Sequence, residues 1–370
     1  MRTAIIHFWL VGMRGGEKVL EAMCRLFPQA DIYTHVYDPA SVSPIIGRHA
    51  VRTTFINKLP FAKRWYQHYL PLMPFALEQL DLRGYDLVIS SESGPAKGVL
   101  TGGGTPHICY CHTPMRYLWD MYQDYLAERG PLTRTAMRFL TPGLRRWDVL
   151  SSMRVDHFAA NSRTVAARIR KHYRRDATVI HPPVDVAAFT PENGRFAPPA
   201  TDAPYLCLGQ LVGYKRADLA VRACAATKRR LVVIGDGPMR KKLEAAAGPT
   251  VQFLGWLDSP ALKSHILGCK ALLFPGEEDF GIVPVEVQAA GRPVIAYRGG
   301  GALETVKEEV SGIFFDEQTE ASLIEALDAF ERRAGDFDPA AINTHAKSFA
   351  PEFFDAAFMD LVNTAMRARP

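Results

Sequence analysis

The 370-residue sequence has no uncharged apolar stretch of about 18 residues, the least that a membrane-spanning helix needs. It has six cysteines, yet no Cys-x-x-Cys pair and no cluster of Cys and His at the spacing of zinc ligands. It also lacks a P-loop and the Gly-x-Gly-x-x-Gly dinucleotide fingerprint. These absences argue against a transmembrane helix, a zinc site, and chemistry on NAD or ATP.

The cysteines are scattered, and the closest two flank Tyr110 in HICYCH (107–112), which alternates like a buried strand. Reduced, buried thiols in a cytosolic protein are therefore expected. The N-terminal run MRTAIIHFWL (1–10) is short and lacks a small-residue cleavage site, so it predicts a first strand and not a signal peptide. The predicted location is the cytoplasm.

Charge is distributed unevenly between the two halves of the chain. Lys and Arg outnumber Asp and Glu by 25 to 16 in residues 1–200, whereas the remaining residues carry 19 against 23. A basic first half favours an anionic partner, such as a phospholipid surface or a pyrophosphate-bearing substrate. No nucleic-acid module accompanies this charge, so nucleic acid is not expected as a partner.

Short apolar strands alternate with helical stretches along the chain, a pattern typical of parallel sheets with helices on both faces. At 370 residues the chain is long for one core. The prediction is an α/β protein with two doubly wound domains facing each other across a cleft. The Pro- and Ala-rich segment 185–204 has the composition of a linker, which places the domains at 1–190 and 200–349. The predicted strands are 3–10, 31–37, 86–90, 107–112, 157–162, 178–182, 205–210, 230–236, 251–256, 271–275, 293–298 and 312–315.

One segment, NKLPFAKRWYQHYLPLMPFALEQL (57–80), departs from this alternation. It mixes Lys58 and Arg64 with Phe61 and Trp65. Basic and aromatic residues together on a short helix suit an anionic membrane interface. A helix whose aromatic face is buried in the core would show the same pattern, so both interpretations stay open.

Two turns between a strand and a helix could hold phosphate. Gly15 and Gly16 follow the first strand, ahead of a helix expected from about Glu17, and amides at such a helix start bind anions. Lys215 and Arg216 occupy the corresponding turn that opens the second half. The alternatives are a tight turn for the glycines and ordinary solvation for the cations. Ligands bind at the carboxyl ends of doubly wound strands, which favours the ligand site for the glycines.

His112 ends the strand HICYCH, and Thr113 and Pro114 suit the cap and first position of a following helix. A histidine at the carboxyl end of a strand would face the expected cleft, where it could bind a sugar hydroxyl or transfer a proton. A lone histidine is more often structural, so the spacing leaves both roles open.

The segment EEDFGIVPVE (277–286) sets two glutamates eight positions apart around a glycine and a proline. Pro284 suits the first turn of a helix, which would place Glu286 in that turn as a partner of the helix dipole. Gly281 leaves neighbouring amides approachable, and a carboxylate such as that of Glu278 accepts hydrogen bonds from adjacent hydroxyl pairs. A solvated loop explains the acids at 277 and 279, but it does not explain the apolar residues between the two glutamates.

The stretch PGEEDFGIVPVEVQAAGRPVIAYRGGGALETV (275–306) resembles the donor-site segment of the family-4 retaining glycosyltransferases. The match comprises the glutamate, seven-residue, glutamate pattern, the FG between the glutamates, and the GG-x-x-E-T-V tail. GGEKVLEAM, HFAANSRTVAARI, VIHPPVDVAAF and IGDGPMRKKLE follow in family order, so the resemblance covers essentially the whole chain. CHTPMRYLWD and GQLVGYKRADLAV resemble a branch of bacterial polysaccharide and O-antigen mannosyltransferases.

The resemblance implies the GT-B fold, with a Rossmann-like acceptor-binding domain followed by a Rossmann-like donor-binding domain. It also implies that a C-terminal helix at about 350–370 packs back on the first domain. Its catalytic set would be His112, Lys215 and Glu278. Glu286 would hold the ribose, while Glu278 would hold the transferred sugar beside the backbone of Phe280, Gly281 and Ile282.

The remaining roles follow from the same resemblance. Lys215 would bind the diphosphate, helped by Arg216 and by the amides of Gly15 and Gly16. His112 would lie near the sugar or the reacting centre. The backbone around Gly255 and Trp256 would meet the base. Gln210 stands where the family usually has arginine, so Lys215 must carry more of the diphosphate contact.

The implied activity is transfer of a hexose from a nucleoside diphosphate sugar to a glycan or polyprenyl-diphosphate-linked glycan, with retention of configuration, in lipopolysaccharide or exopolysaccharide synthesis. The branch suggests GDP-mannose as donor, although UDP-hexoses need no different motif. No Asp-x-Asp motif precedes the site, so transfer without metal or cofactor is expected. Segment 57–80 would attach the protein to the inner face of the cytoplasmic membrane. The alternatives are a nucleotide-sugar epimerase of the same fold and a non-catalytic sugar-nucleotide-binding scaffold.

Overall fold

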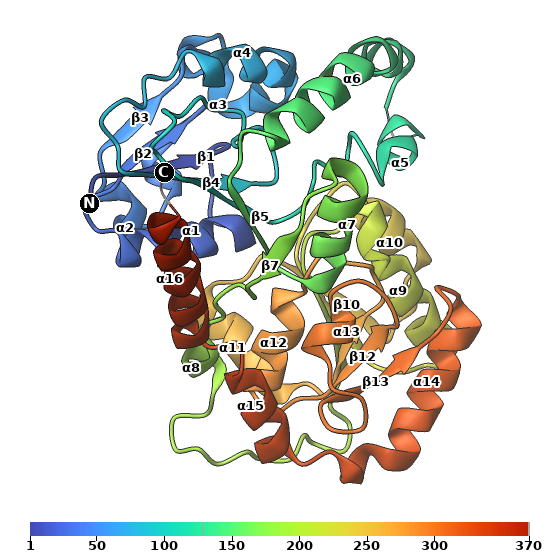
Figure 1. Cartoon of the computed structure of the whole chain (residues 1–370). Coiled ribbons are helices and arrows are strands. Elements are labelled where there is room, and N and C mark those ends of the chain that lie inside the picture. The colour runs from blue at the N-terminus through green and yellow to red at the C-terminus, as the bar shows by residue number, and fades with distance from the viewer. Residues whose placement is uncertain (128, 369–370) are drawn as a thin grey trace. The chain divides into compact units, whose positions relative to one another are not determined.

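The computed structural model describes residues 1–127 and 129–368 (Figure 1). The chain divides into unit 1, formed by Met1–Pro183 with Phe354–Pro370, and unit 2, formed by Val184–Phe353. Each unit is an α/β structure built on a parallel sheet, which confirms the predicted fold class. Within the described residues, no helix combines the length and the apolar character needed to cross a membrane.

In the described part of unit 1, the parallel strands follow the order β3-β2-β1-β4-β5-β6-β7. The order reverses between β1 and β4, so their carboxyl ends form the switch point at which doubly wound sheets bind ligands. All were predicted except β3, a three-residue strand that is not buried and has no apolar run. The strands are β1 Thr3–His7, β2 Asp31–Thr34, β3 Val51–Thr53, β4 Leu87–Glu92, β5 His107–Cys111, β6 His157–Ala160 and β7 Ala177–Val179.

Helices cover this sheet, and the last of them comes from the end of the chain. Phe354, Phe358 and Leu361 of α16 belong to the same buried cluster as Leu20 of α1, and Figure 1 shows the dark red α16 near the blue α1. The chain end therefore completes a core of unit 1. The helices are α1 Gly15–Leu26, α2 Pro44–Gly47, α3 Ala62–Trp65, α4 Met73–Glu78, α5 Tyr122–Ala127, α6 Pro131–Ser152, α7 Arg163–Tyr173 and α16 Pro351–Arg367, with 3₁₀ turns η1 Pro39–Ser41, η2 Phe55–Lys58 and η3 Tyr66–Leu72.

Unit 2 repeats the plan with the strand order β10-β9-β8-β11-β12-β13. Its order reverses between β8 and β11, which gives a second switch point. Every strand was predicted, and the range of β13 was predicted without error. The strands are β8 Tyr205–Leu208, β9 Leu231–Ile234, β10 Val251–Gly255, β11 Leu272–Phe274, β12 Val294–Tyr297 and β13 Gly312–Phe315. The helices are α8 Val186–Phe189, α9 Ala217–Ala226, α10 Arg240–Ala246, α11 Ser259–Gly268, α12 Ile282–Ala289, α13 Ala302–Thr305, α14 Glu320–Arg333 and α15 Pro339–Lys347, with 3₁₀ turns η4 Gly213–Lys215 and η5 Ala334–Asp336.

The segment 185–204 is part of unit 2, so the prediction of an interdomain linker there is wrong. It contains the helix α8, and Val186 lies in a buried cluster of that unit. The guanidinium of Arg292 donates a hydrogen bond to the carbonyl of Ala197 at 2.9 Å. Composition suggested a linker because Pro and Ala dominate the segment, but these few packing contacts hold it against the unit.

The six cysteines are free and buried, as predicted. Cys109 and Cys111 lie in β5, on one face of the strand because residues two apart share a face. Burial raises the pKa of Cys207, Cys224 and Cys269 to about 12, so these thiols stay protonated and act as small apolar side chains.

Candidate active site

Lys215 and Glu278 meet at the switch point of unit 2, where β8 and β11 are neighbours. Lys215 ends the 3₁₀ turn η4 after β8, and Glu278 follows β11 in the loop before α12. Nζ of Lys215 lies 2.9 Å from Oε1 of Glu278, and both residues line a small hollow together with Gly209 and Gln210. The fold therefore brings Lys215 and Glu278 together. The sequence analysis expected Lys215 to bind the diphosphate and Glu278 to bind the sugar, which are adjacent parts of one ligand.

The environment of this pair keeps Lys215 charged. The side chains of Lys215 and Glu278 are only 18% and 21% exposed. Burial disfavours the ammonium ion, but the carboxylate of Glu278 outweighs it, so the pKa of Lys215 is raised above its usual value. Lys215 is thus a cation at neutral pH, in a partly desolvated position where its attraction for an anion exceeds that of a surface lysine.

The backbone comes so close to this pair that glycine is required nearby. A Cβ at Gly276 would lie 2.6 Å from Cα of Lys215, and a Cβ at Gly209 would lie 3.1 Å from its Nζ. A Cβ at Gly300 would lie 2.3 Å from the carbonyl oxygen of Glu278. The sequence analysis gave none of these glycines a role. Their places shortly after β8, β11 and β12 were the available signal, because glycine there permits close backbone approach.

The helix that carries Glu286 begins earlier than predicted. α12 starts at Ile282, with Gly281 at its N-cap in the left-handed region (φ 91°). Glu286 therefore lies in the second turn and not in the first, so that prediction is wrong. Gly281 adopts a backbone conformation that other residues avoid, which lets the helix start directly after it instead of at Pro284. Ile282 supplies an amide to this helix start, where amides lack intrahelical acceptors.

Phe280 and Trp256 differ in what they can offer a ligand. Phe280 is buried, and its ring centroid lies 5.6 Å from that of Phe349, so its side chain supports the loop, while a ligand contact of its backbone stays a prediction. Trp256 is 64% exposed and follows Gly255, whose carbonyl accepts a hydrogen bond from the amide of Gly235 at 2.8 Å. The contact of Gly255 and Trp256 with the base stays a prediction.

Arg216 does not share the surroundings of Lys215. Its guanidinium donates hydrogen bonds to the carboxylate of Asp218 at 3.1 and 3.4 Å, and to the carbonyl of Gln318 at 3.4 Å. The two adjacent cations therefore face different partners. A diphosphate contact by Arg216 stays a prediction, and it would have to compete with Asp218.

In unit 1, Gly16 and His112 come together at the switch point. α1 begins at Gly15, two residues before the expected start, so Gly15 and Gly16 supply the first amides of the helix. A Cβ at Gly16 would lie 3.6 Å from Nε2 of His112. Nε2 of His112 is also 2.9 Å from the hydroxyl oxygen of Ser91 in β4. Helix amides and an imidazole thus share one corner of the sheet.

His112 is neutral in this setting. Burial lowers the pKa of His112 to about 3. The ring can therefore donate one hydrogen bond and accept another at neutral pH, but it is not a cation that could stabilise a diphosphate. This favours contact with a hydroxyl group over contact with phosphate.

The helix predicted directly after Thr113 is wrong. Residues 113–121 form turns, and the next helix, α5, begins at Tyr122. The indole of Trp119 donates to Asp148 at 2.7 Å, and Nε of Arg145 donates to the carbonyl of Leu118 at 2.6 Å. These long-range hydrogen bonds hold the turns in place, so tertiary contacts override the local cap signal.

The segment 57–80 has features of both alternatives that its sequence left open, packing in the core and exposure of aromatic rings. It forms short turns of helix, η2, α3, η3 and α4, and not one amphipathic helix. Ala62 and Met73 are buried in a local core, whereas Phe61, Trp65 and Phe75 are 67%, 46% and 60% exposed. Part of the segment therefore packs inward, and part presents aromatic rings to the surroundings.

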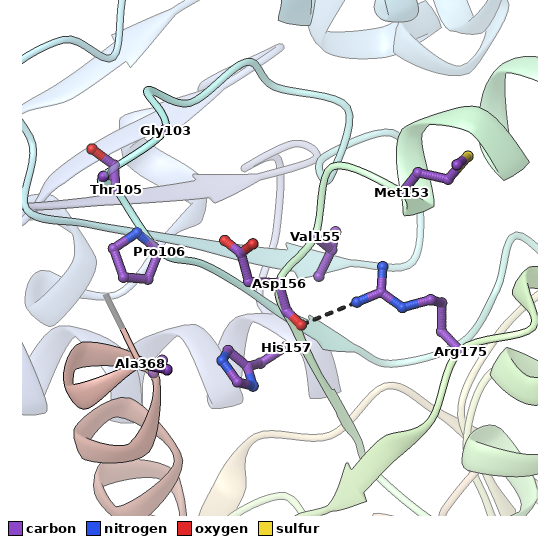
Figure 2. A pocket seen from close by; sticks show the side chains of 11 residues that line it. Gly103, Thr105, Pro106, Met153, Val155, Asp156, His157, Arg175 and Ala368 are labelled. Atoms are coloured by element: carbon purple, nitrogen blue, oxygen red, sulfur yellow. Dashed lines mark hydrogen bonds between the residues drawn. The ribbon is translucent and has the colours of Figure 1, made fainter. Parts of the chain in front are cut away.

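A cavity of about 380 Å³ lies elsewhere in unit 1 (Figure 2). Pro106, Asp156 and His157 line it at the amino ends of β5 and β6, opposite to the strand ends that carry His112. Arg175, which also lines it, donates a hydrogen bond to the carbonyl of Asp156 at 3.0 Å. Doubly wound sheets bind ligands at carboxyl ends, so this cavity is not assigned to the site.

Two family models match successive parts of the chain. The model described as Glycosyltransferase Family 4 matches residues 13–188, and the one described as Glycosyl transferases group 1 matches residues 192–343. Each of these two parts of the chain thus matches a family of glycosyltransferases. The two matches support the family that the sequence resembles, while the mannosyltransferase branch stays a prediction.

Similar proteins place this glycosyltransferase among GT-B folds. D-inositol 3-phosphate glycosyltransferase of Salinispora arenicola is 30% identical over a 195-residue alignment that covers 44% of this chain and 44% of its own, so the match spans less than half of that relative. Sucrose-phosphate synthase from Thermosynechococcus elongatus aligns over 100% of both chains with a TM-score of 0.74 and 19% identity. HepE of Anabaena in complex with UDP-glucose aligns over 98% of this chain and 99% of its own, with a TM-score of 0.70 and 15% identity.

Proposed function

We propose that this glycosyltransferase moves a hexose from a nucleoside diphosphate sugar to a hydroxyl group of a glycan or polyprenyl-diphosphate-linked glycan. The pair of Lys215 and Glu278 carries the proposal, because its groups are 2.9 Å apart at the switch point of unit 2. In a sugar nucleotide the diphosphate and the sugar are also adjacent, since the diphosphate is bonded to C1 of the sugar. One cation and one carboxylate side by side therefore suit the diphosphate and the sugar hydroxyls together.

The reaction would proceed on one face of the sugar and retain its configuration. The bond from C1 to the diphosphate oxygen breaks, and the acceptor oxygen forms a bond to C1. The proton of the acceptor hydroxyl passes to the departing diphosphate. Lys215 and helix-start amides act on the charge that grows on the diphosphate, which is where stabilisation accelerates a reaction. In this scheme these groups, and no metal ion, neutralise the leaving group.

GDP-mannose is the proposed donor, on the resemblance of CHTPMRYLWD and GQLVGYKRADLAV to mannosyltransferases. We expect GDP-mannose to raise the melting temperature of the protein more than UDP-hexoses do, because a ligand that binds only the folded state stabilises it by about 2.7 kcal/mol at 100 times its Kd. Glu286→Gln should reduce this shift by weakening the ribose contact. A thermal-shift screen over GDP- and UDP-sugars measures both effects.

Glu277→Gln is the matched control, since Glu277 is an exposed carboxylate in the same loop and has no proposed ligand role. Its donor-induced shift should equal that of the native protein. A larger shift of the melting temperature with a UDP-hexose than with GDP-mannose would support the proposed reaction with a UDP-hexose as donor. Stabilisation by no sugar nucleotide at all would contradict the proposal.

Two alternatives predict different products. An epimerase would convert the sugar nucleotide alone into an epimer, whereas a transferase needs an acceptor to consume it. A non-catalytic scaffold would bind the sugar nucleotide and form no new product with any acceptor. Incubation with donor alone, followed by incubation with donor and a lipid-linked glycan, separates the three.

We further propose that segment 57–80 meets an anionic membrane surface close to a lipid-linked acceptor. Its exposed rings of Phe61 and Trp65 lie 4.8 Å apart, and Lys58 and Arg64 are exposed beside them. Aromatic and basic side chains together suit the lipid headgroup region. The proposed location is thus the cytoplasmic face of the membrane.

Reversing two of these charges should weaken vesicle binding. We expect K58E/R64E to reduce the affinity for anionic phospholipid vesicles, measured by co-sedimentation, by about 30-fold or more at low salt, since each basic residue near the surface contributes about 1 kcal/mol. The control R332E/K347E reverses two exposed charges in unit 2 and should bind like the native protein. Exposed charges are screened within about 10 Å at 0.1 M salt, so binding should fall as salt rises. Native protein that ignores anionic vesicles at low salt would exclude this role.

A further inference from the structure

A chain of buried polar groups leads away from His112 into unit 1. Ser91 in β4 lies directly beside His7 of β1 in the sheet register. The Ser91 hydroxyl oxygen is 2.9 Å from Nε2 of His112 and 3.1 Å from Nδ1 of His7. The other nitrogen of His7, Nε2, lies 3.5 Å from Oε1 of Glu17. Four side chains from β1, α1, β4 and the end of β5 are thereby connected in series.

Three of the four groups are shielded from water, so their hydrogen bonds must be satisfied within the protein. His7 is 1% exposed, Ser91 0% and Glu17 4%. Burial raises the pKa of the Glu17 carboxyl, but the hydrogen bonds that it accepts from His7 and from the backbone N–H of Arg14 outweigh it and leave that pKa lowered. Glu17 is therefore ionised at neutral pH. An ionised carboxylate only accepts hydrogen bonds.

The proton positions on the other three side chains follow from the ionised carboxylate of Glu17. Glu17 accepts, so Nε2–H of His7 donates to it. With its one proton on Nε2, His7 has a lone pair on Nδ1, which accepts the single hydroxyl proton of Ser91. The Ser91 oxygen in turn accepts from Nε2–H of His112, and neutral His112 is left with a lone pair on Nδ1.

We propose that Glu17, His7 and Ser91 form a relay that holds His112 in the Nε2–H tautomer, so that its Nδ1 is available to accept a hydrogen bond from a ligand hydroxyl at the switch point of unit 1. Glu17, His7 and Ser91 are positioning residues, since they act through His112. The identity of the hydroxyl rests on the proposed function, whereas the tautomer does not. Glu17 thus has two roles, because its other oxygen accepts the backbone N–H of Arg14 at 2.9 Å and caps α1.

Glu17→Gln separates these two roles. The amide oxygen of glutamine can still accept the N–H of Arg14, so the cap is kept. Its NH₂ group donates to Nε2 of His7, which then carries its proton on Nδ1 and donates to Ser91. Ser91 donates to Nε2 of His112, and the proton of His112 moves to Nδ1. The whole relay reverses with one substitution of nearly equal volume.

Nitrogen-15 NMR of histidine-labelled protein detects the tautomer directly, with the signals of His112 identified by their loss in His112→Asn. We expect native His112 to be protonated on Nε2 and the Glu17→Gln variant to be protonated on Nδ1. Two other buried histidines of unit 1 serve as internal references. Nε2 of His35 lies 3.1 Å from the carbonyl of Pro95, and Nδ1 of His107 lies 3.3 Å from the carbonyl of Arg154, so each has its proton fixed on a known nitrogen. Neither should change in the variant.

The result does not depend on activity, so it stays interpretable if the proposed function fails. For the reaction itself, Glu17→Gln should lower kcat about tenfold, the value of one hydrogen bond of about 1.4 kcal/mol, and leave stabilisation by free GDP unchanged. Ser91→Ala breaks the series without touching the α1 cap, and His112 should then show a mixture of tautomers. Native His112 protonated on Nδ1, which a doubly protonated His7 would produce, overturns the relay. An unchanged His112 tautomer in Glu17→Gln does so as well.

Discussion

Replacing Lys215 with alanine should lower kcat by about 10²-fold or more, the scale on which preorganised electrostatic donors act. The substitution removes the ammonium that the structure holds 2.9 Å from Glu278, and it does so in a partly desolvated setting. A uniform loss of binding would raise KM alone, whereas loss of stabilisation on the departing diphosphate lowers kcat. Steady-state kinetics with saturating donor measure the difference.

Two controls make the Lys215 result specific. Arg222→Ala removes an exposed cation from the neighbouring helix α9, where it pairs with Asp218 and Glu320, and should leave kcat unchanged. The double variant Lys215→Ala with Glu278→Gln tests whether part of the loss comes from an uncompensated carboxylate. If kcat stays at its native value in Lys215→Ala, the proposed electrostatic role is wrong.

The strands could be predicted because burial dictates their composition. Parallel strands covered on both faces contain short apolar runs, such as LVI in β4 and LVVI in β9. β3 could not be found in this way, because VRT has a single apolar residue and no apolar run. The prediction thus works for the centre of each sheet and fails at one edge.

The first residue of a helix was harder to predict than a strand, since the conformation of a single residue can shift it. A left-handed Gly281 moves the start of α12 ahead of Pro284 and shifts Glu286 by a turn. After His112 the local cap signal is present, but the turns are held by long-range hydrogen bonds, from Trp119 to Asp148 and from Arg145 to Leu118, and no helix forms there. Both outcomes depend on contacts or dihedral angles that residue types alone do not specify.

The connections between site residues needed the sheet register. The sequence predicted that Lys215 and Glu278 each follow the end of a strand. They are partners because these strands, β8 and β11, are neighbours in the sheet. Likewise, His7 and Ser91 are 84 positions apart, and the parallel pairing of β1 with β4 brings them side by side. Long-range pairing of this kind is not visible in the spacing of one sequence, so the sequence analysis missed the relay.

The largest expected effect on stability comes from another buried group of unit 1. Nζ of Lys97 lies 2.6 Å from Oε1 of Glu92 and also bonds to Asp148, and all three side chains are fully buried. Asp148 accepts further hydrogen bonds from the indole of Trp119 at 2.7 Å and from the hydroxyl of Tyr173 at 2.9 Å. One lysine therefore compensates two carboxylates that water does not reach.

Lys97→Met should lower the free energy of unfolding of unit 1 by about 3–5 kcal/mol, because methionine fills the space but leaves two buried carboxylates without a cation. Urea unfolding followed by tryptophan fluorescence suits the measurement, since four of the five tryptophans, at 9, 65, 119 and 147, belong to unit 1. Lys63→Met, which removes an exposed partner of Asp38, should leave the transition unchanged. A native-like transition for Lys97→Met would show that the carboxylates need no compensation.

The loss in Lys97→Met should also depend on pH, with a sign fixed by Glu92. Burial and the charge of Asp148 already raise the pKa of Glu92 in the native protein, despite the opposing charge of Lys97. Without Lys97 that pKa rises further, so the folded variant keeps its proton at a pH where the unfolded chain has released it. Stability of the variant then falls as pH rises above the ordinary glutamate pKa of about 4.3. The deficit relative to native protein should be smaller at pH 5 than at pH 8, and adding Glu92→Gln should reduce it at pH 8 by removing one of the two buried charges.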